Sequence, residues 1–454
     1  MSVHLPPPTP FLLTHWLSLS HPSHLHSLAR TLQLVVVLDA RNAAAQLQAA
    51  RALAVLASRT TDNRKAITTA EAIPRLVRLL GDGRRVRAGT PQERAAACLA
   101  DLSRLGENKL AIVAEKGVPP LVMILSSDSP EAQTHAAATI WNLCAIGANK
   151  QGIADQGAIS PLVSLLRDGT PEAQKYATGA LWHLAATGDN KHAMVSAGAI
   201  PPLVSALTSD MADAREYAAA VISAISRTQG GNKKAIYKAG GIGPLIELLS
   251  DSSIMTQRHA ACALWGLAEG KEGIYDKQMV EQGAVQPLIV MLMMNHEETR
   301  GFAAACLSAV CADEAAHAAI IDAGGTAPLL ALAQSPTAWL RTQATQMLQL
   351  LGVPFSKSED LPPGYINSPR YSPRHSPAGN HQAGKYLPSP RPLPSPGRGG
   401  GESTAAVSSA FAPPSMVLRT LPIREGKSID PSVENKVQEQ AVCKALTVPI
   451  RPRA

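Results

Sequence analysis

A short segment recurs at a fixed distance along the chain, and this recurrence restricts the fold more than any other feature. The string "TIWNLCAIGANKQGI" at 139–153 is followed 41 residues later by "ALWHLAATGDNKHAM" at 180–194. Prolines that open an apolar run recur at intervals of 41 to 46 residues. A period in this range is typical of stacked helical units, because one unit alone cannot bury its apolar face. The Asn-Lys pair begins at 108, 149, 190 and 232, and the prolines lie at 74, 120, 161, 202, 244, 287 and 328.

Each unit is predicted to contain three helices. A short helix follows the Asn-Lys pair and ends at a glycine such as Gly198, where a left-handed C-terminal residue is wanted. A second short helix begins with proline, which suits the first helical turn. A longer third helix begins at Thr170, whose side chain can cap it, and continues with Pro171 and Glu172. Its buried stripe is predicted to contain Ala177, Ala180, Leu181 and Leu184.

Composition agrees with packed helices. Apolar residues make up 45% of the 454 residues and aromatic residues only 4%, so most of the apolar share is Ala, Leu, Val and Ile. The six cysteines show no CxxC spacing and are predicted to be reduced packing residues of an intracellular protein. No run reaches the roughly 18 apolar residues of a membrane span. We therefore expect a location in the cytoplasm, with the nucleus as the alternative.

Three regions follow from these patterns. Residues 1–40 are predicted to be a low-complexity, disordered leader, with an organellar leader or a metal-binding tract as alternatives because the segment holds five histidines. Residues 41–352 are predicted to form an all-α solenoid of about seven units with a partial unit at its start. Residues 353–454 are predicted to be a disordered, Pro- and Ser-rich tail. The last helix of the solenoid has the polar residues of a terminal cap, namely Arg341, Gln343, Gln346 and Gln349.

The unit resembles the armadillo-repeat family over residues 41–352. The resemblance is carried by the Asn-Lys pair, by runs such as "IPPLVSALTS" and by the start "GTPEAQ" of the third helix. It is similar in particular to plant arrays, those of vacuolar armadillo proteins and of the substrate-binding part of U-box ubiquitin ligases. The resemblance implies a right-handed α-solenoid whose third helices line a concave groove. It also implies a non-catalytic scaffold that binds extended peptide segments in that groove.

In armadillo proteins a recurrent asparagine on the third helix often binds the backbone of an extended peptide. Matched by position, this column keeps asparagine only at Asn142. Asp101, His183 and Gln349 are the other polar residues of the column, and each can hydrogen-bond a peptide amide. The remaining positions of the column carry Val55, Ala224, Gly266 and Ala309.

A second column lies seven residues earlier, almost two helical turns, and should share the groove face. Aromatic and Arg side chains of this kind anchor interfaces, although rings can instead cover the hydrophobic layer. Three tryptophans lie one residue before the asparagine column. The sequence allows two roles for them, packing in the core and contact with a ligand. The second column reads Arg94, His135, Tyr176, Tyr217, His259, Phe302 and Thr342, and the tryptophans are Trp141, Trp182 and Trp265.

Importin-type arrays place a tryptophan four residues before the recurrent asparagine. The aromatic slots that hold the lysines of a nuclear import signal are missing from this chain, so a nuclear import receptor is not expected. The corresponding column reads Ala97, Ala138, Gly179, Ala220, Cys262 and Ala305.

No pattern predicts catalysis, a cofactor, a metal site or a small-molecule substrate. The string "EGKS" at 425–428 lacks, at Leu421, the glycine that a phosphate-binding loop requires. The 40 residues before the array are fewer than a U-box needs by this resemblance, and they lack its pattern. The prediction is therefore an armadillo-only protein or a truncated gene product. The substrate-recognition arm of a U-box ubiquitin ligase is the alternative function.

The net charge of +7 lies mainly in the tail, where 13 Lys and Arg face 7 Asp and Glu at 353–454. Such a tail can attach weakly to an acidic surface such as a microtubule or a membrane, which is a further alternative; nucleic acid is not expected. The loop 81–90, with Arg84, Arg85 and Arg87, can receive an acidic partner or remain a solvated loop.

The tail also carries short motifs. Phosphorylation of its five Ser-Pro sites would cancel local Arg charge, so the sites are predicted to be regulatory. The string "PPGY" matches a ligand of WW domains through Pro362, Pro363 and Tyr365. The predicted phosphorylation sites are Ser368, Ser372, Ser376, Ser389 and Ser395.

Overall fold

The computed structural model describes residues 24–83, 86–228, 231–269, 274–311 and 314–354. In these ranges the chain forms helices and turns, without a β-strand. The tail motifs, including the Ser-Pro sites and "PPGY", and the residues Arg84 and Arg85 lie outside the described residues.

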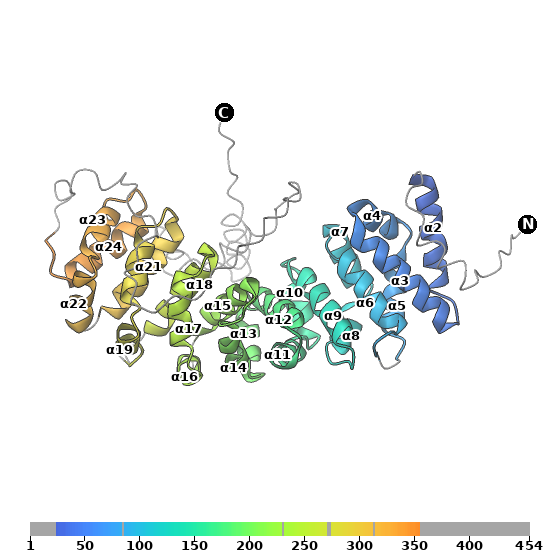
Figure 1. Ribbon diagram of the computed structural model, residues 1–454, viewed down its shortest axis with the longest axis horizontal. Coiled ribbons are helices and arrows are strands. Elements are labelled where there is room, and N and C mark those ends of the chain that lie inside the picture. The colour runs from blue at the N-terminus through green and yellow to red at the C-terminus, as the bar shows by residue number, and fades with distance from the viewer. Residues whose placement is uncertain (1–23, 84–85, 229–230, 270–273, 312–313, 355–454) are drawn as a thin grey trace, which may run out of the picture. The chain divides into compact units, whose positions relative to one another are not determined.

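The described helices repeat in threes, as predicted (Figure 1). The first helices are α4 (Thr61–Thr69), α7 (Gly106–Ala114), α10 (Asn149–Asp155), α13 (Gly188–Ser196), α16 (Asn232–Lys238), α19 (Ile274–Glu281) and α22 (Glu314–Asp322). The second helices are α5 (Ala72–Leu80), α8 (Val118–Ile124), α11 (Ile159–Asp168), α14 (Ile200–Ala206), α17 (Ile242–Glu247) with the 3-10 turn η1 (Leu248–Ser250), α20 (Val285–Leu292) and α23 (Thr326–Ala333). The third helices are α6 (Pro91–Leu102), α9 (Pro130–Cys144), α12 (Pro171–Leu184), α15 (Ala212–Ser226), α18 (Ile254–Ala268), α21 (Glu297–Val310) and α24 (Ala338–Leu350).

The third helices form one continuous layer. Each contacts the third helix of the next unit, from α3 (Ala43–Arg59) of the partial first unit through to α24. Alanines such as Ala177 and Ala180 are fully buried between them, which confirms the predicted stripe of small residues. The stack is therefore an all-α solenoid of seven complete units, with a core that runs from unit to unit.

The turn after each first helix explains why most units have a glycine at this position. At this turn the chain adopts a positive φ, for example 78° at Gly198, and the next amide, of Ala199, donates to the carbonyl of Met194 at 3.0 Å. This is the hydrogen bond of a Schellman C-cap. The first two units place Glu71 (φ 56°) and Lys116 (φ 58°) at this position, where a side chain is strained.

The asparagine of the Asn-Lys pair has a structural role. The Asn108, Asn149 and Asn190 side chains are buried, and each amide nitrogen donates to the backbone carbonyl six residues earlier, at 2.9 to 3.1 Å. That carbonyl belongs to the last turn of the preceding third helix, whose final carbonyls lack helical partners. The asparagine thus fastens the end of one unit to the start of the next.

The boundary expected at residue 40 is wrong for the second half of the predicted leader. Helix α2 (His24–Val37) packs against α3 and α4, with Leu34, Val35 and Leu38 buried. Leu34 and Val35 lie on the inner face of this helix, whereas Val36 between them and Leu38 is exposed. Residues 1–23 lie outside the described part.

At the other end, Arg341, Gln346 and Gln349 are exposed on α24, as a terminal cap requires. Among the described helices, none alone is long and apolar enough to cross a bilayer; the bent pair Ala316–Asp322 and Thr326–Ala333 reaches that length and composition only together.

Candidate functional site

The asparagine column lies on the third-helix layer, and Asn142 is its one asparagine. The side chain is partly exposed on α9, and its amide nitrogen donates to Ser103 Oγ at 3.0 Å and to the Ala100 carbonyl at 3.5 Å. These bonds to the end of α6 fix the orientation of the amide. No described group donates to the Asn142 Oδ1, so this oxygen can accept a hydrogen bond from a ligand.

His183 takes the same position on α12 but has a different environment. Its side chain is buried, at 6% exposure, and stacks on the Trp182 ring with centroids 4.9 Å apart. Burial, together with the charges of Lys150 and Lys109, lowers the pKa of His183 to about 4. The imidazole is therefore neutral at pH 7, and its contact with a partner stays a prediction.

The other two polar members of the column are accessible. Asp101 is partly exposed on α6, where burial raises the pKa of its carboxyl and Arg104, at 3.8 Å, opposes that shift. Gln349 is exposed on α24, in the terminal unit.

Four rings from three units pack together in the middle of the layer. Trp141 lies 5.6 Å from Tyr176 and 6.2 Å from Tyr217, measured between ring centroids. Trp182 stacks on Tyr217 at 5.2 Å with an interplanar angle of 14°. Trp141, Tyr176 and Tyr217 are partly exposed, whereas Trp182 is buried. These rings pack between units, and three of the four also reach the surface. Packing and an exposed surface for a ligand are therefore compatible for them.

Gly179 makes room for this cluster. A Cβ atom at this position would lie 2.8 Å from Trp141 Nε1 and 3.1 Å from a ring carbon of Tyr217. Gly179 belongs to the column in which import receptors carry tryptophan. The indole of the preceding unit thus covers the position from which that tryptophan would project.

The rings of the later units are more deeply packed. His259 and Phe302 are only 2% and 4% exposed, and Phe302 lies between Trp265 at 6.1 Å and Trp339 at 5.9 Å. Burial, followed by the charges of Arg258 and Arg227, lowers the pKa of His259 to about 3.

At the opposite end of the column, Arg94 and His135 are partly exposed. Arg94 is ion-paired to Glu93 at 3.1 Å. Burial lowers the pKa of His135, although the neighbouring Asp101 and Glu93 charges oppose this shift. Thr342 is exposed on α24.

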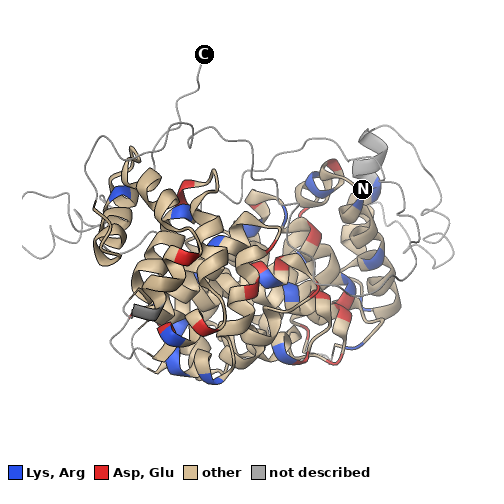
Figure 2. Ribbon diagram, turned by 60° about the vertical axis from the view of Figure 1, so that its left-hand side comes forward, with Lys and Arg blue, Asp and Glu red and all other residues tan. Residues whose placement is uncertain are grey.

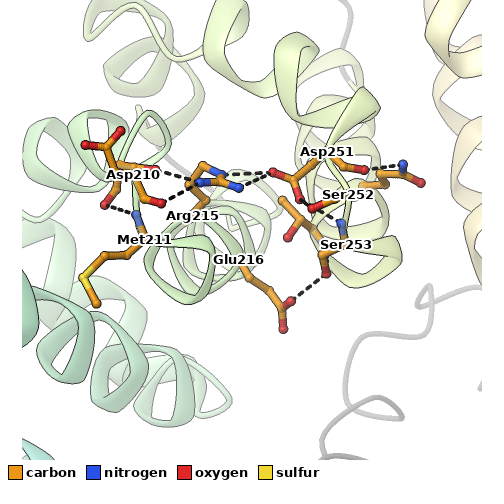
Figure 3. Close-up of polar contacts among 10 residues, drawn as sticks. Asp210, Met211, Arg215, Glu216, Asp251, Ser252 and Ser253 are labelled. Carbon is orange, nitrogen blue, oxygen red and sulfur yellow. Dashed lines mark hydrogen bonds and ion pairs between the residues drawn. The ribbon is translucent and has the colours of Figure 1, made fainter. Parts of the chain in front are cut away.

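Polar bonds join successive third helices near their N-terminal ends. Ser129 Oγ, which caps α9, donates to the buried Glu93 of α6 at 2.8 Å. Between α15 and α18, Ser253 Oγ donates to Glu216 at 2.9 Å, and Arg215 pairs with Asp251 at 2.8 Å (Figure 3). These charged groups thus have partners within the protein.

The C-terminal ends of the third helices are different. The lysines of three Asn-Lys pairs, Lys109, Lys150 and Lys191, are partly buried beside these ends, and burial lowers the pKa of each ammonium. None of the three makes an ion pair or hydrogen bond with another side chain in the part of the chain that the structure describes. We name these residues the lysine row. In the sequence, the Asn-Lys pairs served only to identify the repeat. The recurrence of a lysine at one position of successive units could have indicated a row of positive charge.

Arg87, in the loop that breaks the period, lies 3.9 Å from Asp128 and so has an acidic neighbour in the protein itself. The described cysteines are free and buried, consistent with packing residues. Within the described ranges, no group of three His, Cys, Asp or Glu side chains is placed to hold a metal ion.

Comparison with known proteins agrees with the repeat architecture. Residues 32–305 match the family model described as the plant U-box protein ARM repeat region. No curated protein matches the chain.

Among solved structures, an engineered protein is 28% identical and has a TM-score of 0.57, covering 73% of this chain and 92% of its own. A designed armadillo repeat protein is 27% identical, with a TM-score of 0.47 over 52% of this chain and 99% of its own. A further designed armadillo repeat protein, in complex with the peptide (KR)4, is 25% identical, with a TM-score of 0.45 over 52% of this chain and 99% of its own.

Proposed function

We propose that this chain, which belongs to the plant U-box protein ARM repeat region family, is a scaffold that binds an extended protein segment along its third-helix layer. The observation that carries the proposal is the state of Asn142. Its nitrogen is held by the end of α6, and its partly exposed oxygen lacks a donor within the described chain. Such an oxygen is suited to accept the backbone N–H of an extended segment.

The ring cluster beside Asn142 supports the same surface. Tyr176 and Tyr217 are partly exposed, yet neighbouring rings hold them in place, so their ordering adds little to the entropic cost of binding. Tyrosine and tryptophan supply much of the binding energy at protein interfaces. A segment that bonds Asn142 can therefore pack its side chains on Tyr176.

Selection of peptides from a random displayed library on the full-length chain tests this proposal. Replacing Asn142 and Tyr176 by alanine together should weaken the binding of the selected peptides by about tenfold or more. His183 is left unchanged because its burial would make alanine a packing defect. Tyr237 and Asn295, the same residue types outside the third-helix layer, provide the matched double-alanine control.

Equal binding by the Asn142/Tyr176 variant and wild type would show that the peptides bind elsewhere. Failure to select any peptide on the folded chain would also reject the proposed function.

A second candidate function is suggested by the family match. In this proposal the scaffold selects substrates for a U-box ubiquitin ligase. Sequencing the transcript upstream of the Met1 codon tests it, followed by a ubiquitin-transfer assay with the encoded protein and a selected peptide fused to a reporter. An in-frame U-box and transfer that depends on Asn142 are expected. Absence of both results rejects the ligase role and leaves the scaffold role intact.

A further inference from the structure

We propose that the segment bound by the third-helix layer is acidic, with carboxylates that pair with the lysine row along α6, α9 and α12. The inference rests on the proposed function, since it assigns a chemistry to the segment bound at the same surface. Its basis is the position of Lys109, Lys150 and Lys191, none of which has an ion pair or a side-chain hydrogen bond within the described residues.

The lysines are anchored beside the candidate site. Each follows an asparagine whose side chain bonds the last turn of the preceding third helix, so the lysine backbone is fixed at the C-terminal end of that helix. The charges of Lys109 and Lys150 both act on His183, the α12 member of the asparagine column. The row and the column therefore belong to one surface.

Partial burial without a partner is an unfavourable state for an ammonium group. Loss of water lowers the pKa of all three lysines, which means that the charged form is poorly solvated in the free protein. A carboxylate placed beside each one would restore the lost interaction. An anionic ligand therefore gains more at these lysines than at fully hydrated surface lysines.

The row has defined ends. In the unit before it, Arg64 donates to the Ala57 carbonyl at 3.0 Å and to Thr61. In the unit after it, Lys233 donates to the carbonyl of Glu269. Within the described residues, lysines that lack a partner at this position of the unit therefore occur in three successive units, and the first two of these carry Asn142 and Tyr176.

Spacing and charge complete the match. Packed helices lie about 8–10 Å apart, and an extended chain rises about 3.3 Å per residue. Acidic residues at every second or third position of a segment can therefore meet successive lysines. In the view of Figure 2, acidic and basic residues are interspersed along the described helices. The basic tail of this chain has the wrong charge to be the occupant.

The composition of library peptides selected on the full-length chain is the first measurement. Enrichment of Asp and Glu at alternate or every third position is expected. Enrichment of basic or uncharged peptides would overturn the acidic assignment while the proposed scaffold function stands. No enrichment of any peptide would instead reject the scaffold function itself.

The second measurement is the affinity of a selected peptide for a lysine-row variant. Lys109, Lys150 and Lys191 are all replaced by glutamine, and about tenfold weaker binding is expected, with a shallower dependence on salt. The control replaces the exposed Lys116, Lys234 and Lys238 by glutamine, which removes the same charge elsewhere. Equal losses of peptide affinity in the two variants would show that only the net charge of the protein matters, and this would overturn the proposal.

Two further peptides identify the anion. In the first, every Glu is replaced by Gln, and its binding to wild type should fall to that of the acidic peptide on the lysine-row variant. In the second, phosphoserine replaces Glu. Binding of the phosphoserine peptide alone would overturn the assignment to carboxylates.

Discussion

The two edges of the third-helix layer use charge in opposite ways. At the N-terminal edge, Glu93, Arg215 and Glu216 bond to groups of the adjoining unit. At the C-terminal edge, the lysine row recurs at one position of three successive units but has no such partners in the described chain. Lys233 has the same position in its unit but donates to the carbonyl of Glu269, so recurrence alone does not distinguish a charge that joins units from a charge left for a ligand. The distinction appears only when the neighbours of each charge are known.

A large effect of pH on stability is expected at His183, which lies beside the lysine row; the more deeply buried His259, with a pKa of about 3, acts in the same direction. The folded pKa of His183, about 4, is below the unfolded value of about 6.5, so the unfolded state binds the extra proton between these pH values. Stability should therefore fall by about 3 kcal/mol as pH falls through this window. Asp276, with a pKa raised to about 6 by burial, acts in the opposite direction.

Comparing the stability of wild type with that of the His183→Asn variant isolates the contribution of the histidine, because all other titrating groups are the same in the two proteins. The variant should lose about 3 kcal/mol less than wild type between pH 6.5 and pH 4, measured by urea unfolding at each pH. Parallel stability curves for the two proteins would contradict the assigned burial of the imidazole.

A smaller effect is expected at the N-terminal edge. Glu93→Ala removes a buried carboxylate that accepts hydrogen bonds from Ser129 Oγ and the Gly89 amide. The free energy of unfolding should drop by about 2 kcal/mol. Thermal unfolding followed by circular dichroism measures it, with the exposed Glu172→Ala as the control. Equal loss in both variants would show that the bond between units adds nothing.

The sequence predicts the solenoid well because its rules are local. Proline openings, the Thr170 cap and the turn at Gly198 each depend on residues a few positions apart, and the structure confirms the cap and the turn. The environment of the column residues depends instead on other units. Trp182, beside His183, stacks on Tyr217 of the next unit. Trp141 lies against Gly179 of the next unit, where a Cβ atom would be in its way. No rule applied to one unit contains such facts.

The same reasoning explains the error at the N-terminus. Helix α2 has no Asn-Lys pair and no proline opening, so a search by period does not find it. Its inner face, with Leu34 and Val35, is recognisable only as the cover of α3.

A modest effect on binding is expected at Asp101, the carboxylate of the layer. Its charge opposes an acidic ligand at the same surface as the lysine row. Asp101→Asn should strengthen the binding of selected acidic peptides by about threefold, measured by fluorescence anisotropy at low salt. Weaker binding by this variant would argue for a basic ligand.

The smallest effect sharpens the contrast between the edges. Replacing the whole lysine row by glutamine should change the free energy of unfolding by about 0.5 kcal/mol or less, because no bond within the described protein is lost. Thermal unfolding is the measurement. A drop as large as that of Glu93→Ala would mean that these lysines hold the units together after all.

The Asn149 and Asn190 bonds to the helix ends have a consequence for how such a chain can change. Because the two junctions are built alike, a tandem duplication of 149–189 would join matching ends and preserve both attachments. Each added copy would bring another lysine in register with the others. Recombination between neighbouring units could thus lengthen or shorten the recognised segment in whole steps, without redesigning a single contact.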